Sequence, residues 1–490
     1  MNNFQKRLVA WTLMFVMIIS SSVAVTASET PLYDNDTEYD LTYDYYSGTE
    51  YESDIIFVDD LVNDPEFVAD LRAELAAEFG AEFMVNQDRA GAMIDAFMNV
   101  LPVRRDGTVI YPENYGGMYV DSYGNLVILI AKERSNGNQE QIGSITPDRN
   151  SGIPECAAML VAEFTYVSVR YVEFTYEEIM RVWQVIYDYM AMHGYRPDEY
   201  VIVECPVILN LNAIEMDIIE NRVNVYLYNT REHYIDLFRS IVIDHPAVNF
   251  LYAVHVYVEY SPYMGEKNEY FGFQPFIFAM RQGQQIYRRC PNNANNVRWQ
   301  SVGFRARCRT TRNLGFVSTM HGNATVRTLR AGDRIYRATP LTQANLAATV
   351  TRVSIGTDAS FMTLSNNASM LNTAVNGTIV GTTIHSNPIV GQVVTRISDG
   401  GSPTSPRASA GTIVSLNYIR NVPSVGNVLT HRSSYVAFSG DSGGIVVRLV
   451  AGANAQVSGI HIARTFQQNS EHGLFAPTQR VLTGLNIELH

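Results

Sequence analysis

The pattern of apolar residues changes at about residue 276, and this change constrains the fold more than any other feature. Before it, apolar residues recur at helical spacing in several segments. After it, they form short β-branched runs separated by Gly, Asn, Ser and Thr. Many short strands at such intervals predict an antiparallel sandwich or barrel. A chain of 490 residues is also too long for one core. We therefore expect an α+β region followed by an all-β region.

Local patterns predict individual elements in both regions. In the first region they predict helices over 64–79, 174–192 and 230–243, a hairpin formed by 116–121 and 126–130, and strands at 223–228 and 248–258. In the second they predict strands at 315–319, 347–353, 378–384, 411–416 and 445–450, and a closing helix within 477–489.

The N-terminus has the features of a secretory signal peptide over residues 1–27. Lys6 and Arg7 precede an apolar run over 8–19, and small residues follow at 25–27. An uncleaved membrane anchor is the alternative, although about 20 apolar residues are needed to span a bilayer. Residues 28–52 are acidic and tyrosine-rich, which predicts a disordered leader. We expect a secreted product with no stable membrane association after signal removal.

Charge divides the chain at a similar place. Residues from Arg281 to His490 contain 20 arginines, no lysine and 6 acidic residues, a net charge of +14. The whole chain carries −13, so the preceding residues carry −27. Such opposite charges favour association of the two halves. The alternative is that each half simply has a solvated charged surface. Association with an acidic partner also explains the arginine excess without nucleic-acid binding.

Four cysteines divide evenly between the halves, Cys156 and Cys205 in the first and Cys290 and Cys308 in the second. In an exported protein, a disulfide within each half is a reasonable expectation. The spacing of cysteines and histidines does not match a zinc site, and no segment resembles a nucleotide-binding loop. We therefore expect neither a metal nor a cofactor.

The run Ser439-Gly440-Asp441-Ser442-Gly443-Gly444 carries the strongest chemical signal. A serine on a glycine-rich turn can present its hydroxyl and nearby backbone N–H groups to one substrate carbonyl. Acyl transfer needs this arrangement because negative charge develops on the carbonyl oxygen. The sequence therefore predicts Ser442 as a nucleophile.

A serine nucleophile needs a base, usually a histidine oriented by a carboxylate. His321 follows an apolar strand and is the only histidine between Cys290 and Asp358. Three aspartates lie between His321 and the serine run. Asp333 and Asp399 occur in glycine-containing, turn-like segments, whereas Asp358 begins an apolar strand. We predict the triad His321, Asp358 and Ser442, against the alternative that His321 is structural.

With this chain order, residues 277–490 resemble the bacterial branch of the chymotrypsin-like serine proteases, the α-lytic protease and streptogrisin group. The matching segments are 283–287, 301–304, 315–317 before His321, 394–396, 411–413 and the run that contains Ser442. The resemblance implies two six-stranded antiparallel barrels with the site between them. It also implies an oxyanion hole formed by the N–H groups of Gly440 and Ser442.

The same resemblance implies that residues 28–276 are a pro-region that assists folding and then blocks the site until it is removed. We expect two subdomains, 55–150 and 151–276, and processing within 266–280. A permanently attached binding domain is the alternative. The family usually has a cysteine directly after the catalytic histidine, but Gly322 stands here. The family's disulfides are therefore absent, and Cys290–Cys308 would be a different bridge.

Substrate preference is less constrained by the sequence. Trypsin-like relatives have an aspartate six positions before the nucleophile, but Val436 stands here, so cleavage after Lys or Arg is not expected. Glutamate-specific relatives often have a histidine in the Gly-Ile-His setting of His461, and Arg464 is nearby. These residues favour acidic substrates, whereas a buried structural His461 would fit a preference for apolar residues. Ala437 and Arg464 lack the hydroxyl groups that many glutamate pockets use.

The sequence thus predicts a secreted serine endopeptidase, made as a zymogen, that acts on polypeptides through an acyl-enzyme at Ser442. The competing prediction is a catalytically inactive, protease-like β-barrel binding protein, which would require one triad residue to be unusable.

Overall fold

The computed structural model describes residues 65–105, 108–132, 167–193, 205–253, 278–290, 293–321, 328–339, 341–366, 368–399, 408–422, 425–438, 440–450, 453–467 and 470–490. The chain divides into two units, Met1–Ile56 and Phe57–His490, and all described residues belong to the second. The signal peptide, the leader, Cys156, Gly322 and the boundary expected at 276 lie outside them. The helices within these ranges include none long and apolar enough to cross a bilayer.

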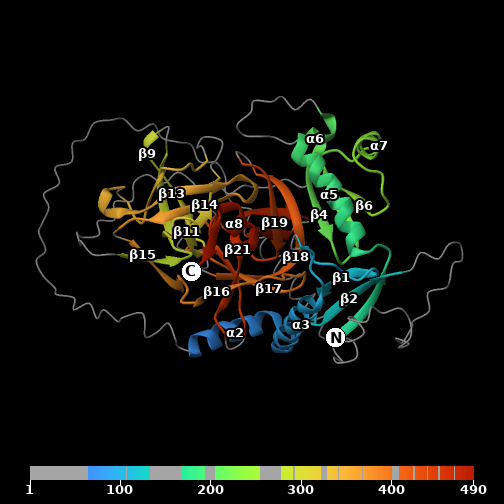
Figure 1. The fold of residues 1–490 in the computed structure, drawn as a ribbon, viewed down its shortest axis with the longest axis horizontal. Coiled ribbons are helices and arrows are strands. Elements are labelled where there is room, and N and C mark those ends of the chain that lie inside the picture. Colours follow the sequence, from blue (N-terminus) through green and yellow to red (C-terminus); the bar gives the residue numbers. More distant parts are fainter. Residues whose placement is uncertain are drawn as a thin grey trace, which may run out of the picture. The chain divides into compact units, whose positions relative to one another are not determined.

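The first part of the chain forms an α+β subdomain (Figure 1). Its elements are α2 (Pro65–Phe79), α3 (Ala81–Val100), β1 (Tyr115–Val120), β2 (Leu126–Ala131) and β3 (Val167–Val172). The predicted β1–β2 hairpin is confirmed, and β3 adds to β2 in parallel. Met93, Ile94 and Phe97 of α3 pack with Leu126 and Ile128 of β2 in one buried cluster.

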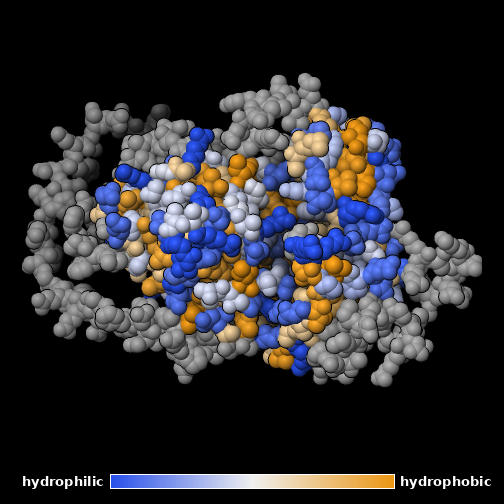
Figure 2. All heavy atoms as spheres, in the orientation of Figure 1, coloured by the Kyte–Doolittle hydropathy of each residue, from blue (hydrophilic) through white to orange (hydrophobic). Residues whose placement is uncertain are grey.

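A second α+β subdomain follows. Its elements are α5 (Tyr176–His193), α6 (Pro206–Asn210), β4 (Leu211–Asp217), β5 (Arg222–Leu227), α7 (Glu232–Ile241) and β6 (Val248–Tyr252). The side chain of Thr175 accepts a hydrogen bond from the Glu178 amide at the start of α5. This bond satisfies one amide that the helix itself leaves unpaired. The opposite surface of α5 keeps apolar residues exposed, including Val185 and Met192. Figure 2 shows hydrophobic residues gathered on one face of this subdomain.

The third part begins with an antiparallel sheet. Its strands are β8 (Gln285–Cys290), β9 (Asn293–Ser301), β10 (Arg305–Cys308), β11 (Leu314–Thr319), β12 (Arg334–Tyr336), β13 (Leu346–Ser354), β14 (Ala359–Leu364) and β23 (Ile487–Leu489). The strands β9 and β10 are parts of one bent segment. At the bend, the Val302 amide donates to the Gln284 carbonyl beside β8, and the Gly303 amide donates to Val317 of β11. The sheet therefore closes into a barrel.

A second barrel follows. Its strands are β17 (Val393–Ile397), β18 (Ala408–Val422), β19 (Gly426–Ser433), β20 (Ile445–Arg448), β21 (Ala455–Gln467) and β22 (Ser470–Pro477). The pairing of β17 with both β20 and β18 closes the ring. The parallel pair β7 (Phe278–Gln282) and β15 (Ala368–Ala374), the strand β16 (Val380–Ile384) and the helix α8 (Thr478–Leu485) complete this half. The double-barrel fold class is confirmed.

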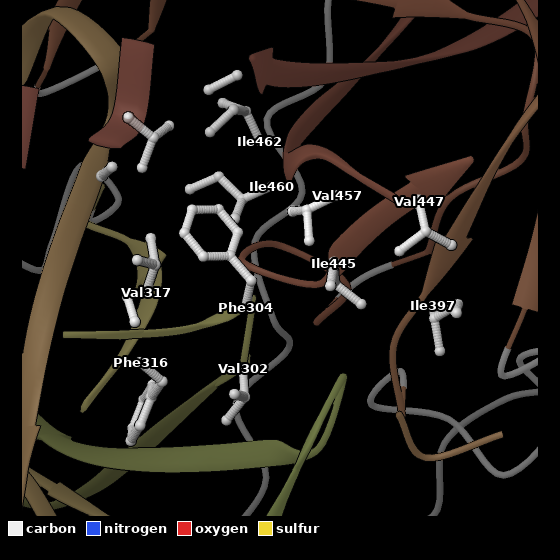
Figure 3. Close-up of a cluster of buried hydrophobic side chains, with 14 of the residues drawn as sticks. Val302, Phe304, Phe316, Val317, Ile397, Ile445, Val447, Val457, Ile460 and Ile462 are labelled. Atoms are coloured by element: carbon white, nitrogen blue, oxygen red, sulfur yellow. The ribbon is translucent and has the colours of Figure 1, made fainter. Parts of the chain in front are cut away.

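The two barrels share one apolar core (Figure 3). In this core Val302, Phe304, Phe316 and Val317 of the first barrel belong to the same buried cluster as Ile397, Ile445, Val447, Val457, Ile460 and Ile462 of the second. Close packing of this kind resists relative movement of the two sheets. The shared core therefore holds the loops of one barrel in a fixed position relative to the loops of the other.

The second α+β subdomain extends the sheet of the second barrel. Its strand β4 pairs with β18, for example Ile214 opposite Ile419 and Ala213 opposite Arg420. Across this pairing Glu215 of β4 forms a buried ion pair with Arg432 of β19, at 2.8 Å. Burial raises the pKa of the Glu215 carboxyl, and Arg432 opposes that effect. Opposite charges of the two halves therefore meet inside a shared sheet.

The predicted disulfide between Cys290 and Cys308 is not formed in this structure. Cys308 is a free, buried cysteine, and the side chain of Cys290 lies outside the described residues. The two residues end β8 and β10, which are not neighbours in the strand order. A disulfide needs Cα atoms within about 7 Å. Cys205 is also free, and its Sγ lies 2.9 Å from the Tyr189 hydroxyl.

Candidate active site

Ser442 lies on the turn before β20. Some backbone amides of this turn donate hydrogen bonds within the protein, and others do not. The Asp441, Gly443 and Gly444 amides donate to Phe438, His461 and Asp441 carbonyls respectively. The Gly440 and Ser442 amides have no acceptor among the described residues. Gly440 and Gly443 have φ values of 94° and 91°, which favour glycine. Two donors on the same turn are thus left for another group.

A buried ion pair between Asp441 and Arg396 stabilises this turn. The Asp441 carboxylate lies 2.7 Å from the Arg396 guanidinium, and both side chains are completely buried. The Ser398 hydroxyl and the Phe438 amide also donate to Asp441, at 2.5 and 2.6 Å. Burial raises the pKa of Asp441, and Arg396 opposes that effect first. Asp441 is therefore anchored to the end of β17 through Arg396 and Ser398, which fixes the backbone that carries Ser442.

His321 and Asp358 lie side by side at the ends of neighbouring strands. The strand β11 leads to His321, and Asp358 comes directly before β14, its partner in the sheet. His321 Nδ1 lies 2.5 Å from Asp358 Oδ2, and both residues are buried. Asp358 has a left-handed backbone, φ 48° and ψ 41°, a conformation that aspartate tolerates better than most residues. The predicted pair is thus in hydrogen-bonding contact.

Ser442 is tied to the first barrel, but its hydroxyl is not bonded to His321 in this structure. The hydroxyl donates to the Ile462 carbonyl at 3.1 Å. The Ser301 amide, in β9, donates to the Ser442 carbonyl at 2.8 Å. A serine–histidine bond is often absent without substrate and forms in the reacting complex. The turn nevertheless lies against the barrel that carries His321.

A buried polar network that sequence reasoning missed connects the two barrels at this point. The Ser301 hydroxyl donates to the Gly440 carbonyl at 2.9 Å, and the Ser318 hydroxyl donates to the Ser301 carbonyl at 2.7 Å. Gln300 Nε2 donates to both Ser318 and Thr319. In the sequence, the only sign of this network is that the polar residues Gln300 and Ser301 come directly before Val302. Two polar residues alone do not predict a buried network. The network orients the strand that leads to His321 and the turn that contains Ser442.

The residues expected to set specificity lie beside the same turn. Val436 is 42% exposed, whereas His461 is completely buried and its Nδ1 lies 3.0 Å from the Tyr435 hydroxyl. Burial first, and then the charges of neighbouring cationic groups, hold the pKa of His461 well below its ordinary value. Its Nε2 has no partner among the residues that the structure describes. Burial therefore favours the neutral form of the ring, which also interacts with the Leu474 backbone.

Arg464 provides a positive charge near this histidine. Its Nη1 lies 3.3 Å from Glu471 Oε1 and donates to the Ala437 carbonyl at 3.4 Å. The same Glu471 oxygen accepts from the Ala437 amide at 3.5 Å. A carboxylate is thus already held between a guanidinium and a backbone amide close to the serine turn.

Comparison with known proteins gives one family match and several distant structural neighbours. Residues 73–156 match a family described as a Pro-like N-terminal domain. Thermobifida fusca Protease A is 22% identical, covers 43% of this chain and 98% of its own, and has a TM-score of 0.33. A Nocardiopsis protease is 21% identical, with 44% and 100% coverage and a TM-score of 0.33.

A third neighbour is described as a glutamic acid specific serine protease that uses a histidine triad in substrate binding. It is 17% identical, covers 43% of this chain and 100% of its own, and has a TM-score of 0.32. No curated protein matches the chain. All these likenesses are distant, so the function has to be inferred from the site itself.

Proposed function

We propose that the chain is a secreted serine endopeptidase, made as a zymogen, with the triad His321, Asp358 and Ser442. The observation that carries this proposal is the pair of unbonded amides, Gly440 and Ser442, on the turn that contains Ser442. The buried contact between His321 and Asp358 supports it. Secretion is proposed from the N-terminal sequence pattern alone.

The proposed reaction follows from these positions. The Asp358 carboxylate accepts a hydrogen bond from the Nδ1–H group of His321 without taking the proton, which leaves Nε2 free to act as the base. The Ser442 hydroxyl turns from Ile462 toward His321, gives up its proton and attacks the substrate carbonyl carbon. The Gly440 and Ser442 amides bind the oxyanion, and each such donor is worth about 2.7–4 kcal/mol of barrier. His321 then protonates the leaving amine, and water, deprotonated by His321, releases the acyl group.

A fluorophosphonate probe tests the proposal directly, because it labels a serine only where a base and an oxyanion site act together. We expect one labelled site in the processed protein, with the probe's mass on the peptide that contains Ser442. Ser442→Ala abolishes the label, whereas Ser434→Ala, a change on a nearby solvent-exposed serine, leaves it. An unlabelled, folded and processed wild-type protein would instead support the inactive binding protein.

We also propose that the N-terminal region is a pro-region that is removed by cutting outside the described residues. The match of residues 73–156 to a Pro-like N-terminal domain supports this proposal. We expect secreted wild-type material to contain a species with the mass of residues 277–490, and Ser442→Ala to remain full length if the enzyme cuts itself. A full-length wild-type species that is stable and active would contradict inhibition and favour an attached binding domain.

We further propose a preference for an acidic residue before the cut bond. Arg464 supports this preference, since its guanidinium already lies beside the Glu471 carboxylate, whereas the complete burial of His461 supports the alternative. Peptides that differ only at this residue, Glu, Gln or Leu, test it through kcat/KM. We expect Glu to exceed Gln by about tenfold or more, because a hydrogen bond to a charged group contributes about 1.5–3 kcal/mol.

The matched variant for this preference is Arg464→Met, which should lower kcat/KM for the Glu peptide and leave the Leu peptide nearly unchanged. Equal rates for Glu and Leu in the wild type would remove the acidic preference. That result would favour the alternative, a structural His461 in an enzyme that prefers apolar residues.

A further inference from the structure

The loop over residues 385–392, which joins β16 to β17 in the second barrel, lies against the first α+β subdomain. Ile389 from this loop belongs to a buried cluster whose other fully buried members all come from residues 90–130. Only 7% of Ile389 and 3% of Val390 is exposed. Val390 belongs to another buried cluster, which also contains Ile419 and Leu429 of its own barrel. Ile389 is therefore shielded from water by the N-terminal region.

Backbone groups pair at the same contact. The Val120 amide of β1 donates to the Val390 carbonyl at 2.8 Å, and the Val393 amide donates to Gln87 Oε1 of α3 at 2.5 Å. Gly391 has φ 90°, and a Cβ there would lie 1.9 Å from the Val120 carbonyl oxygen. The close approach of the two segments therefore requires glycine.

A second glycine, Gly91, leaves space for the side chain of Arg448 from the barrel. Gly91 lies inside the helix α3, where glycine costs about 1 kcal/mol relative to alanine. A Cβ there would lie 1.9 Å from Arg448 Nη2, so the absent side chain leaves room for Arg448 of β20. Asp88 and Asp95 of α3 interact electrostatically with Arg448. At this contact, acidic residues of the N-terminal half interact with a basic residue of the C-terminal half.

Hydrogen bonds within the second barrel stabilise the conformation of the 385–392 loop. The His385 ring lies 3.0 Å from the Ser458 hydroxyl through Nδ1 and 3.0 Å from Gln392 Oε1 through Nε2. The Ile389 amide donates to the same Gln392 oxygen. These bonds do not involve the N-terminal region, so they hold the loop shape whether or not that region is bound. A preorganised surface loses less entropy on binding.

We propose that the 385–392 loop and Arg448 form a docking surface for the α3–β1 subdomain of the pro-region, separate from the pairing of β4 with β18. Once the chain is cut, the pro-region stays on the second barrel through two attachments. Each attachment raises the effective concentration at the other, so loss of one weakens retention far more than its own contacts suggest. The proposal rests on the proposed role of the N-terminal region, and its partner is that region of the same chain.

The test uses the full chain with Ser442→Ala, which removes any dependence on activity. In this background Ile389→Asp places a carboxylate in the apolar cluster of the partner. We expect hydrogen exchange at the Val120 and Val393 amides to become at least about tenfold faster, because both bonds cross the contact. Exchange along the β4–β18 ladder should stay unchanged. Val353→Asp, which adds the same charge at an exposed position of β13, is the matched control.

Gln87→Met is a second variant, nearly isosteric, that removes the acceptor of the Val393 amide. If Ile389→Asp prevents folding, the same exchange measurement is made with Gln87→Met. Unchanged exchange at Val120 with either folded variant would overturn the proposal. Equally faster exchange along β4–β18 would also overturn it, because the two contacts would then not be separate.

Retention is measured after a site for a specific protease is placed within 254–277 and cut in the same background. We expect the N-terminal piece to co-elute with the barrels, and Ile389→Asp to speed its release by at least about 100-fold. Equal release rates for Ile389→Asp and Val353→Asp would contradict the proposal. These readouts need no catalysis, so an inactive triad and a failed docking surface give different results.

Discussion

His321→Ala is expected to lower kcat of the processed enzyme by about a millionfold, the loss typical of removing the base from a triad that acts as a unit. Asp358→Asn should cost about 10⁴, because asparagine keeps the shape of the site but disfavours the tautomer of His321 with a free Nε2. Asparagine also tolerates the left-handed backbone at position 358. Steady-state hydrolysis of a peptide ester measures both losses.

Asp333→Asn is the matched control for Asp358→Asn. The Asp333 carboxylate accepts a hydrogen bond from the Arg330 amide in an exposed turn. Its replacement should leave kcat within about twofold, since such substitutions usually change little. Similar losses at positions 333 and 358 would mean that Asp358 has no special relation to His321. Unchanged kcat with His321→Ala would remove the triad altogether.

Arg396→Met is expected to have the largest effect on stability. It leaves the Asp441 carboxylate completely buried without its cation, and breaking such a pair typically costs about 3–5 kcal/mol of unfolding free energy. The Ser442→Ala background prevents self-digestion, and equilibrium denaturation by urea measures the change. Fluorophosphonate labelling of the Arg396→Met enzyme should also slow, because the Ser442 turn loses its anchor.

A double variant separates charge from shape at this site. Adding Asp441→Asn to Arg396→Met removes the unpaired charge, so it should recover part of the lost stability. Arg307→Met disrupts a solvent-accessible pair with Glu488 and should change stability little. Equal effects of Arg396→Met and Arg307→Met would show that the buried pair does not hold the turn.

The barrels and the contact between His321 and Asp358 could be predicted because both leave local signals in the sequence. Glycines mark the Ser442 turn, and apolar runs mark β11 and β14, whose pairing brings His321 to Asp358. Predicted helices over 64–79 and 174–192 correspond to α2 and α5. Each of these features depends on residues close together in the chain, where spacing is informative.

Other features depend on contacts between residues far apart in the chain, for which spacing contains no signal. The helix α3 was not predicted, because its pattern is interrupted by Gly91, which accommodates Arg448 from β20. Arg396 was recognised only as part of a strand, yet it pairs with Asp441. The predicted disulfide fails because cysteine counts give no information about strand order.

The shared sheet of β4 and β18 has one more consequence. If the N-terminal region is removed as proposed, Leu416, Ile419 and Arg420 lose the strand opposite them. Backbone donors and acceptors there become an open edge, which any extended polypeptide can use as a template. The processed protein should therefore self-associate more readily than the full-length chain as its concentration rises.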